Sequence, residues 1–226
     1  MSRLPRIVVP GVAHHVTQRG NRRQRVFLVE DDYALYKDWL AQACAANGVS
    51  VWSYCLMPNH VHLILVPFDD SGLSSAIGET HRRYSAYINA RLRATGHLFQ
   101  GRFGCVAMDE THLMAAFRYV ALNPVKAKLS KTAADWEWSS AAAHLEGRDD
   151  GLVTVRPLLD RVDNVAEFLD MEADATLEAA LAKGQSIGRP LMSDAALTAL
   201  EQRLGRPIRP RKRGRPVLLN NPRLQK

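Results

Sequence analysis

The alternation of apolar and polar positions predicts a series of short strands and amphipathic helices in the first 125 residues. The strands are expected over residues 14–19, 49–56, 60–66 and 103–108. The helices are expected over residues 31–46, 71–94 and 109–123, the last ending there because the residue before Pro124 disfavours helical angles. This β-α-β-β-α-β-α order predicts an α+β fold, with a small, mainly antiparallel sheet covered by helices.

The 226-residue length fits one ordinary domain with extensions. We expect a folded domain over residues 1–145, with the Trp136–Ser140 segment packing back on it. Residues 146–204 are interpreted as a small extension, acidic at first and then helical, with Ser193 capping its last helix. The Arg/Pro-rich residues 205–226 are expected not to fold without a partner.

The net charge of +7 is concentrated at the two ends of the chain. Six arginines and no acid occur up to Arg25, and nine basic residues and no acid from Arg203 onward, so the middle is net acidic. Basic ends are often merely solvated. Two separate basic ends favour binding to a polyanion, and nucleic acid is the partner they indicate.

Nothing in the chain indicates a membrane or a secretory route. The longest uncharged apolar run is too short to cross a bilayer, and no apolar segment follows Arg3 and Arg6 at the N-terminus. The three cysteines are an odd number without metal-site spacing, which is typical of reduced, buried thiols. A cytoplasmic protein is therefore expected.

His60-Val61-His62 is the pattern with the clearest chemical content. It lies in a predicted strand, where residues two apart point to the same face, so the two imidazoles should lie side by side. A single histidine in such a strand is usually structural, but two must both find polar partners near the core. Neutral imidazole is a common ligand of divalent metals, which makes a metal site the alternative.

Tyr119 and Asn123 are four residues apart in the last predicted helix and should share a helix face. An amide oxygen is a suitable ligand for Mg²⁺ or Mn²⁺ beside imidazoles. A helical tyrosine alone is more often a packing residue, so Tyr119 becomes a candidate only beside the histidines. Asp109 and Glu110 are interpreted as helix caps and not as catalytic acids.

Taken together, these motifs resemble the single-tyrosine HUH transposases, and more fully the REP-associated tyrosine transposases. The resemblance covers about the first 140 residues in the order and spacing of the family. The segments that carry it are His15-Val16-Thr17-Gln18-Arg19-Gly20-Asn21, Met57-Pro58-Asn59-His60-Val61-His62, Phe99-Gln100-Gly101-Arg102-Phe103 and Tyr119-Val120-Ala121-Leu122-Asn123-Pro124-Val125-Lys126-Ala127.

The resemblance implies a ferredoxin-like HUH domain that cuts and rejoins single-stranded DNA near palindromic hairpins. It implies that His60, His62 and Asn123 bind a divalent metal, Mg²⁺ or Mn²⁺, and that Tyr119 forms a 5′-phosphotyrosine. A replication initiator or relaxase is a rival enzyme, although these usually carry more tyrosines or a helicase domain. A protein that recognises repeats without cleaving is the rival from another class, and monomer and homodimer both remain open.

Basic and aromatic residues supply candidate DNA contacts. Those for phosphate are Arg19, Arg22, Arg23, Arg82, Arg83, Arg102, Arg211, Lys212, Arg213 and Arg215. Those for stacking on unpaired bases are Tyr84, Tyr87, Phe99 and Phe103. The tail element Arg213-Gly214-Arg215-Pro216 resembles an AT-hook core, and we expect the tail to hold the duplex stem of a hairpin.

Overall fold

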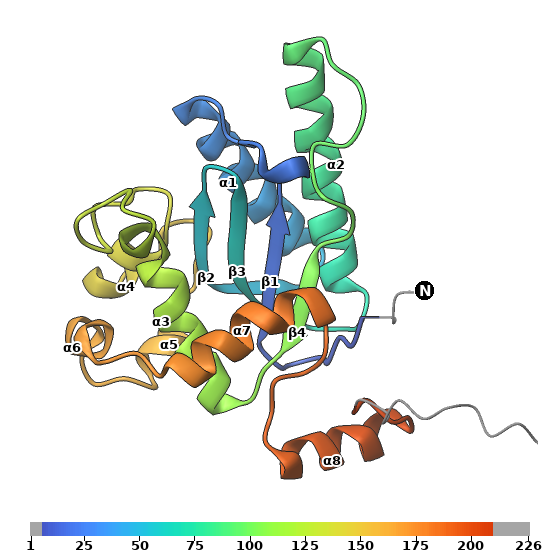
Figure 1. The fold of residues 1–226 in the computed structure, drawn as a ribbon, viewed down its shortest axis with the longest axis vertical. Helices are drawn as coiled ribbons and strands as arrows, with labels where there is room; N and C mark the ends of the chain where they lie inside the picture. Colours follow the sequence, from blue (N-terminus) through green and yellow to red (C-terminus); the bar gives the residue numbers. More distant parts are fainter. Residues whose placement is uncertain (1–5, 210–226) are drawn as a thin grey trace, which may run out of the picture.

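A four-stranded antiparallel sheet is the centre of the fold (Figure 1). The computed structural model describes residues 6–209, except for the side chains of residues 185–187. The strands are β1 (His14–Arg19), β2 (Val49–Met57), β3 (His60–Pro67) and β4 (Gly104–Ala107), in the order β2-β3-β1-β4. With α1 (Glu30–Ala46) and α2 (Gly72–Leu92) this gives the split β-α-β-β-α-β arrangement, which confirms the predicted α+β, ferredoxin-like fold.

The two faces of the sheet carry different side chains because residues alternate along each strand. On β3, Val61, Leu63 and Leu65 enter the core beneath α1 and α2. Ile64 points to the opposite face, into a second core beneath α3 (Glu110–Lys126). His60 and His62 share the parity of Ile64 and lie on that second face. The helix α3 therefore covers the histidine side of the sheet.

The helix α3 is longer than the sequence predicts. Asp109 caps its start by accepting the backbone N–H of His112, as expected, but the helix continues to Lys126 with Pro124 inside it. The expected end at Asn123 is wrong because the turn after Pro124 still closes, with the Ala127 N–H donating to the Asn123 carbonyl. The extra turn places Asn123 within the helix and not at a frayed end.

The outer edge of β2 is covered by the segment that follows α3. Leu56 donates its backbone N–H to the Trp138 carbonyl, and the Trp136 indole donates to the Leu56 carbonyl. This is the predicted return of Trp136–Ser140, and it protects an edge strand that would otherwise expose unpaired backbone groups. The short helices α4 (Ala141–Glu146), α5 (Arg156–Leu159) and α6 (Val165–Asp170) follow.

The C-terminal helices are α7 (Ala175–Ile187) and α8 (Asp194–Leu204), and Ser193 caps α8 as expected. Figure 1 shows α7 crossing β4, and it also packs on α3. Leu181 of α7 is fully buried in the same core as Phe117 of α3. Leu191, in the connection to α8, forms a parallel bridge with Met108 and covers the edge of β4. No helix among residues 6–209 is long and apolar enough to cross a membrane.

Candidate functional site

The strand β3 places His60 and His62 side by side on the face covered by α3. Their ring centroids are 4.8 Å apart and the rings are nearly perpendicular. His62 is buried, whereas His60 is partly exposed. The pairing of imidazoles expected from their alternation in the strand is thus present in the structure.

His15 on β1 contacts His62 from the neighbouring strand. The antiparallel register pairs His15 with Ile64, so His62 is its diagonal neighbour on the same face. The rings stack with centroids 5.2 Å apart, and Nε2 of His15 lies 3.0 Å from Nδ1 of His62. Because this contact engages Nδ1 of His62, Nε2 is the ring nitrogen of His62 that remains for another partner.

Asn59 has the equivalent position beside His60. Nδ1 of His60 lies 2.6 Å from Oδ1 of Asn59, an acceptor, so this nitrogen donates and Nε2 carries the lone pair. The amide nitrogen of Asn59 donates in turn to the Arg23 carbonyl. Arg22 and Arg23 both have positive φ, a conformation that residues other than glycine seldom adopt.

All three imidazoles of the cluster favour the neutral form. Burial lowers the pKa of His15 to about 4. Burial and then the nearby Arg19 lower the pKa of His60 to about 4. Burial, followed by the neighbouring imidazoles and Arg19, holds the pKa of His62 well below its usual value. Neutral rings have a lone pair to offer, which protonated rings lack.

Tyr119 on α3 faces this cluster from above the sheet. Its ring meets the edge of His62 with centroids 5.4 Å apart and that of His15 at 6.1 Å. The ammonium of Lys126 lies 5.5 Å from the centre of the Tyr119 ring and forms an ion pair with Glu178 of α7. Asn123 is one helical turn beyond Tyr119 and half-buried; within residues 6–209 its side chain makes no hydrogen bond.

The donor set fits a divalent metal. His62 Nε2 is buried and has no hydrogen-bond partner in the described part of the chain, so a Lewis acid would satisfy an atom that is otherwise costly to bury. The contact with Asn59 leaves the lone pair of His60 Nε2 for such an ion. The contact with His15 does the same for His62 Nε2 when His62 Nδ1 is the donor. Among the described residues no three His, Cys, Asp or Glu side chains are grouped for a metal.

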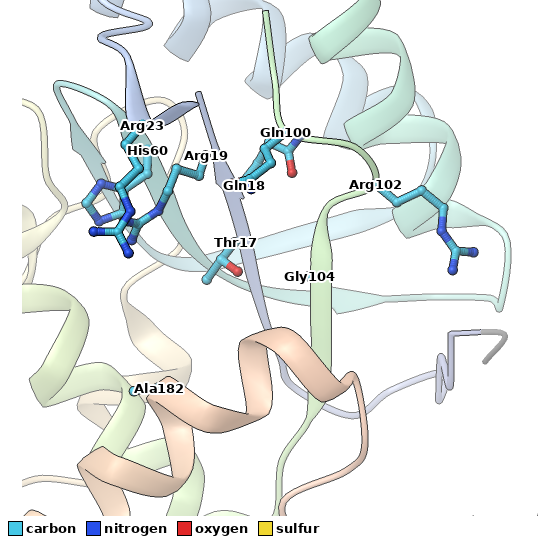
Figure 2. A pocket seen from close by; sticks show the side chains of 9 residues that line it. All are labelled: Thr17, Gln18, Arg19, Arg23, His60, Gln100, Arg102, Gly104 and Ala182. Atoms are coloured by element: carbon cyan, nitrogen blue, oxygen red, sulfur yellow. The ribbon is translucent and has the colours of Figure 1, made fainter. Parts of the chain in front are cut away.

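A hollow of about 350 Å³ opens beside His60, and we call it the histidine hollow (Figure 2). Arg19 and Arg23 lie next to His60 in Figure 2, and Arg102 lies on the other side of β4. Ala182 of α7 bounds the histidine hollow at the bottom of the view in Figure 2. The lining residues are Thr17, Gln18, Arg19, Arg23, His60, Gln100, Arg102, Gly104 and Ala182.

The other predicted phosphate contacts have different surroundings. Arg22 is exposed and does not line the histidine hollow. Arg82 is exposed on α2 and pairs with Glu79, whereas Arg83 lies over the Trp39 ring with its guanidinium carbon 4.6 Å from the ring centre. The four predicted tail contacts lie outside the described residues. They are Arg211, Lys212, Arg213 and Arg215.

One of the predicted stacking residues is unable to stack on a base. Tyr84 is fully buried and donates its hydroxyl to the Val26 carbonyl, because this position of α2 faces the core and not solvent. Tyr87 is half-buried, with Arg91 over its ring. Phe99 and Phe103 are largely buried but line a second hollow beside α2.

Sequence reasoning missed the contact of His15 with His62 and the position of Lys126. His15 lies in a predicted strand, so its face could have been assigned, but its contact with His62 depends on the strand register. Lys126 lies beyond the end of the predicted helix. Only the extra turn of α3 brings it over Tyr119.

Comparison with known proteins places the chain in a family. The family described as IS200-like transposases matches residues 8–123, which is half of the chain and includes β1, both histidines, Tyr119 and Asn123. This chain belongs to the IS200-like transposases. A search of curated proteins finds no match.

Two solved structures are similar to this IS200-like transposase, and the first of them supports the fold. One is a REP-associated tyrosine transposase bound to a REP hairpin, at 20% sequence identity and a TM-score of 0.56. The similarity covers 68% of this chain and 92% of that one. A second, a proposed transposase from Deinococcus radiodurans R1, matches at 22% identity and a TM-score of 0.38 over 53% of this chain and 95% of its own.

Proposed function

We propose that this protein cuts and rejoins single-stranded DNA beside palindromic hairpins through a covalent bond to Tyr119. The observation that carries the proposal is the position of the Tyr119 ring, 5.4 Å from that of His62, above two neutral imidazoles with free nitrogens. This arrangement combines a nucleophile with ligands for a metal. Membership of a transposase family supports the same conclusion.

The proposed reaction is a transesterification at phosphorus. The Tyr119 hydroxyl oxygen attacks a DNA phosphate, its proton passes to solvent, and the bond from phosphorus to the 3′-oxygen breaks. The products are a 5′-phosphotyrosine and a free 3′-OH, and the released oxygen takes up a proton. Because one phosphoester replaces another, the reverse attack by a 3′-OH can rejoin a strand without ATP.

His60, His62 and Asn123 would hold the divalent ion, Mg²⁺ or Mn²⁺. When bound, such an ion neutralises phosphate charge and favours attack by an oxygen nucleophile. The protein residues keep the two ring nitrogens available, with Asn59 orienting His60 and His15 orienting His62. Lys126 over the Tyr119 ring helps to fix the position of the nucleophile.

The arginines of the histidine hollow would bind the backbone of the strand. Arg19 and Arg23 lie beside His60, so their charges can meet the phosphate that Tyr119 attacks. The hollow is open and polar, which suits an extended strand better than a small apolar ligand. The similar transposase that is bound to a REP hairpin supports a hairpin as the duplex part of the substrate.

A covalent-adduct assay tests the proposal. The full-length protein is incubated with labelled single-stranded DNA containing a palindromic hairpin, with Mn²⁺, Mg²⁺ or EDTA, and resolved on a denaturing gel. We expect a labelled protein band that requires the metal and is absent from Tyr119→Phe. Tyr87→Phe is the matched control, because it removes a half-buried tyrosine hydroxyl on α2, which packs on the face of the sheet opposite to the histidines, and should leave the adduct intact.

The rival from another class is a protein that recognises repeats without cleaving them. It would bind the hairpins and give no adduct with any metal or flanking sequence. An adduct that persists in Tyr119→Phe would contradict the assigned nucleophile. Loss of the adduct in His60→Ala and His62→Ala, with hairpin binding retained, would support the proposed ligands.

A further inference from the structure

A second hollow, of about 400 Å³, lies on the other side of β4, and we call it the α2 hollow. It is bounded by α2, by the loop that precedes β4 and by Arg6 of the N-terminal segment. Its volume is within the range of about 300–1,000 Å³ that is typical of small-molecule sites. Its lining includes Arg6, Gln18, Gly78, His81, Phe99 and Arg102.

The walls of the α2 hollow combine aromatic rings with cations. His81 and Phe99 pack at a ring distance of 4.4 Å and form an apolar surface. Arg6 lies over Phe103, with its guanidinium carbon 3.6 Å from the ring centre. Aromatic rings next to guanidinium groups are the surroundings in which proteins hold unpaired bases and their phosphates.

Gly78 shows that this space is left open in the middle of a helix. Glycine weakens a helix interior relative to alanine. A Cβ atom at Gly78 would meet no other atom within 4 Å, so packing does not require glycine here. A larger side chain at this position would extend into the hollow, since Gly78 is part of its lining.

The α2 hollow adjoins the histidine hollow. Gln18 and Arg102 line both, and the Gln18 amide donates to the Gly101 carbonyl in the loop between them. Arg102 points away from His60 in Figure 2. A strand whose phosphate lies beside His60 can therefore continue around the end of β4 to the second hollow.

We propose that the α2 hollow binds one unpaired nucleotide of the same DNA strand that enters the histidine hollow. The proposal rests on the function proposed above and adds a second recognition site, separate from the reacting phosphate. The base packs against the rings of His81 and Phe99. The amide of Gln18 and the hydroxyls of Ser74 and Ser85 offer hydrogen bonds to its edge.

Binding measurements in EDTA test this site independently of cleavage. The probes are one hairpin without extensions and the same hairpin with single-stranded extensions on both sides. We expect the wild-type protein to prefer the extended hairpin, and Gly78→Leu to bind the extended hairpin about tenfold more weakly. Binding of the blunt hairpin should not change. Ala86→Leu is the control, because it adds similar bulk at an exposed position of α2 that does not line the hollow.

A base analogue locates the nucleotide. With 2-aminopurine placed at each extension position in turn, one position should change its fluorescence on binding, and Gly78→Leu should remove that change. If Gly78→Leu fails to fold, Ser74→Leu narrows the same hollow from an exposed position.

Two results would overturn the proposal: equal binding of the two hairpins by the wild type, or unaltered binding of the extended hairpin by folded Gly78→Leu. An adduct with Tyr119 in either case would leave the proposed function standing. Conversely, Gly78→Leu could weaken binding of the extended hairpin alone while the wild type forms no adduct. That result would support the nucleotide site and contradict the proposed cleavage.

Discussion

Nε2 of His15 lies 3.0 Å from Nδ1 of His62, and both rings are buried. Only one proton fits between these two nitrogens, so one of them donates and the other accepts. If His62 donates, its Nε2 keeps a lone pair that can bind a metal. If His15 donates, His62 Nε2 carries the proton and is closed to a metal. The tautomer at this contact therefore controls whether His62 can act as a ligand.

Replacing His15 by phenylalanine tests this coupling, because the ring packing is kept while the acceptor is removed. We expect Mn²⁺ to bind about tenfold more weakly or worse to His15→Phe. Titration calorimetry measures the affinity, and ¹⁵N shifts of the metal-free His62 ring report its tautomer directly. His15→Gln supplies an acceptor oxygen again and should recover part of the affinity. Unchanged Mn²⁺ binding by a folded His15→Phe protein would show that the contact is only packing.

Asn59 should act on His60 in the same way. Asn59→Ala removes the acceptor for the His60 Nδ1 proton and the donor to the Arg23 carbonyl. We expect weaker metal binding and lower adduct yield, with little change in blunt-hairpin affinity. Asn59→Asp retains the acceptor for His60, so it should preserve metal binding better than alanine. Equal loss in the two variants would argue that the support of the Arg22–Arg23 turn, and not the orientation of His60, is what matters.

Most of the fold and the pair of histidines could be predicted from the sequence, since both depend on local alternation. The strand and hairpin around Pro58 and the caps at Asp109 and Ser193 follow from residues close in the chain. The contact of His15 with His62 could not be predicted, because the two residues are 47 positions apart in sequence and meet only through the register of their strands. Nor could the turn beyond Pro124, because tertiary packing can outweigh the helix-ending tendency of the residue before a proline.

The buried histidines predict a loss of stability in mild acid. Burial lowers the pKa of His14 and His15 to about 4 and that of His81 to about 3, whereas unfolded histidine titrates near pH 6.5. Between about pH 6.5 and 4 the unfolded chain therefore binds more protons than the folded one, so the free energy of unfolding falls as the pH falls. The contribution is at most about 2 kcal/mol per buried histidine between pH 7 and 5.

Urea denaturation at pH 7.5, 6.5, 5.5 and 4.5 measures this dependence, and a flat profile down to pH 5 would contradict it. The buried carboxylates do not cause a similar loss of stability in this pH range. Burial raises the pKa of Asp32, but the Arg91 side chain and two backbone amides outweigh it, so the pKa is lowered and its contribution is lost only at lower pH. His14→Gln should reduce the pH dependence of the free energy of unfolding by the contribution of one histidine.

Asp150 should matter for stability more than its ion pair alone suggests. Its carboxylate accepts from Lys37, from the Tyr54 hydroxyl and from the backbone of Leu152 and Val153. Burial raises its pKa, but these donors outweigh it and lower the pKa overall. We expect Asp150→Ala to reduce the free energy of unfolding by about 2–3 kcal/mol, since it leaves several donors unpaired. Lys37→Met removes the ion pair and the ammonium over the Tyr54 ring, and should cost about 1 kcal/mol or less. Equal effects in urea melts would contradict this assignment.

The basic tail should contribute to hairpin binding through charge. The cut should follow Arg209 and not Gly205, because Ile208 is buried and Arg209 pairs with Glu201. We expect removal of residues 210–226 to weaken hairpin binding and to lower the salt dependence of log K by about 0.9 for each phosphate that the tail neutralises. The melting temperature should not change. Glutamine at Arg211, Lys212, Arg213 and Arg215 should reproduce the effect with chain length preserved. An unchanged salt slope in both proteins would show that the tail does not touch the duplex, and would leave Arg19 and Arg23 as the main candidates for phosphate binding.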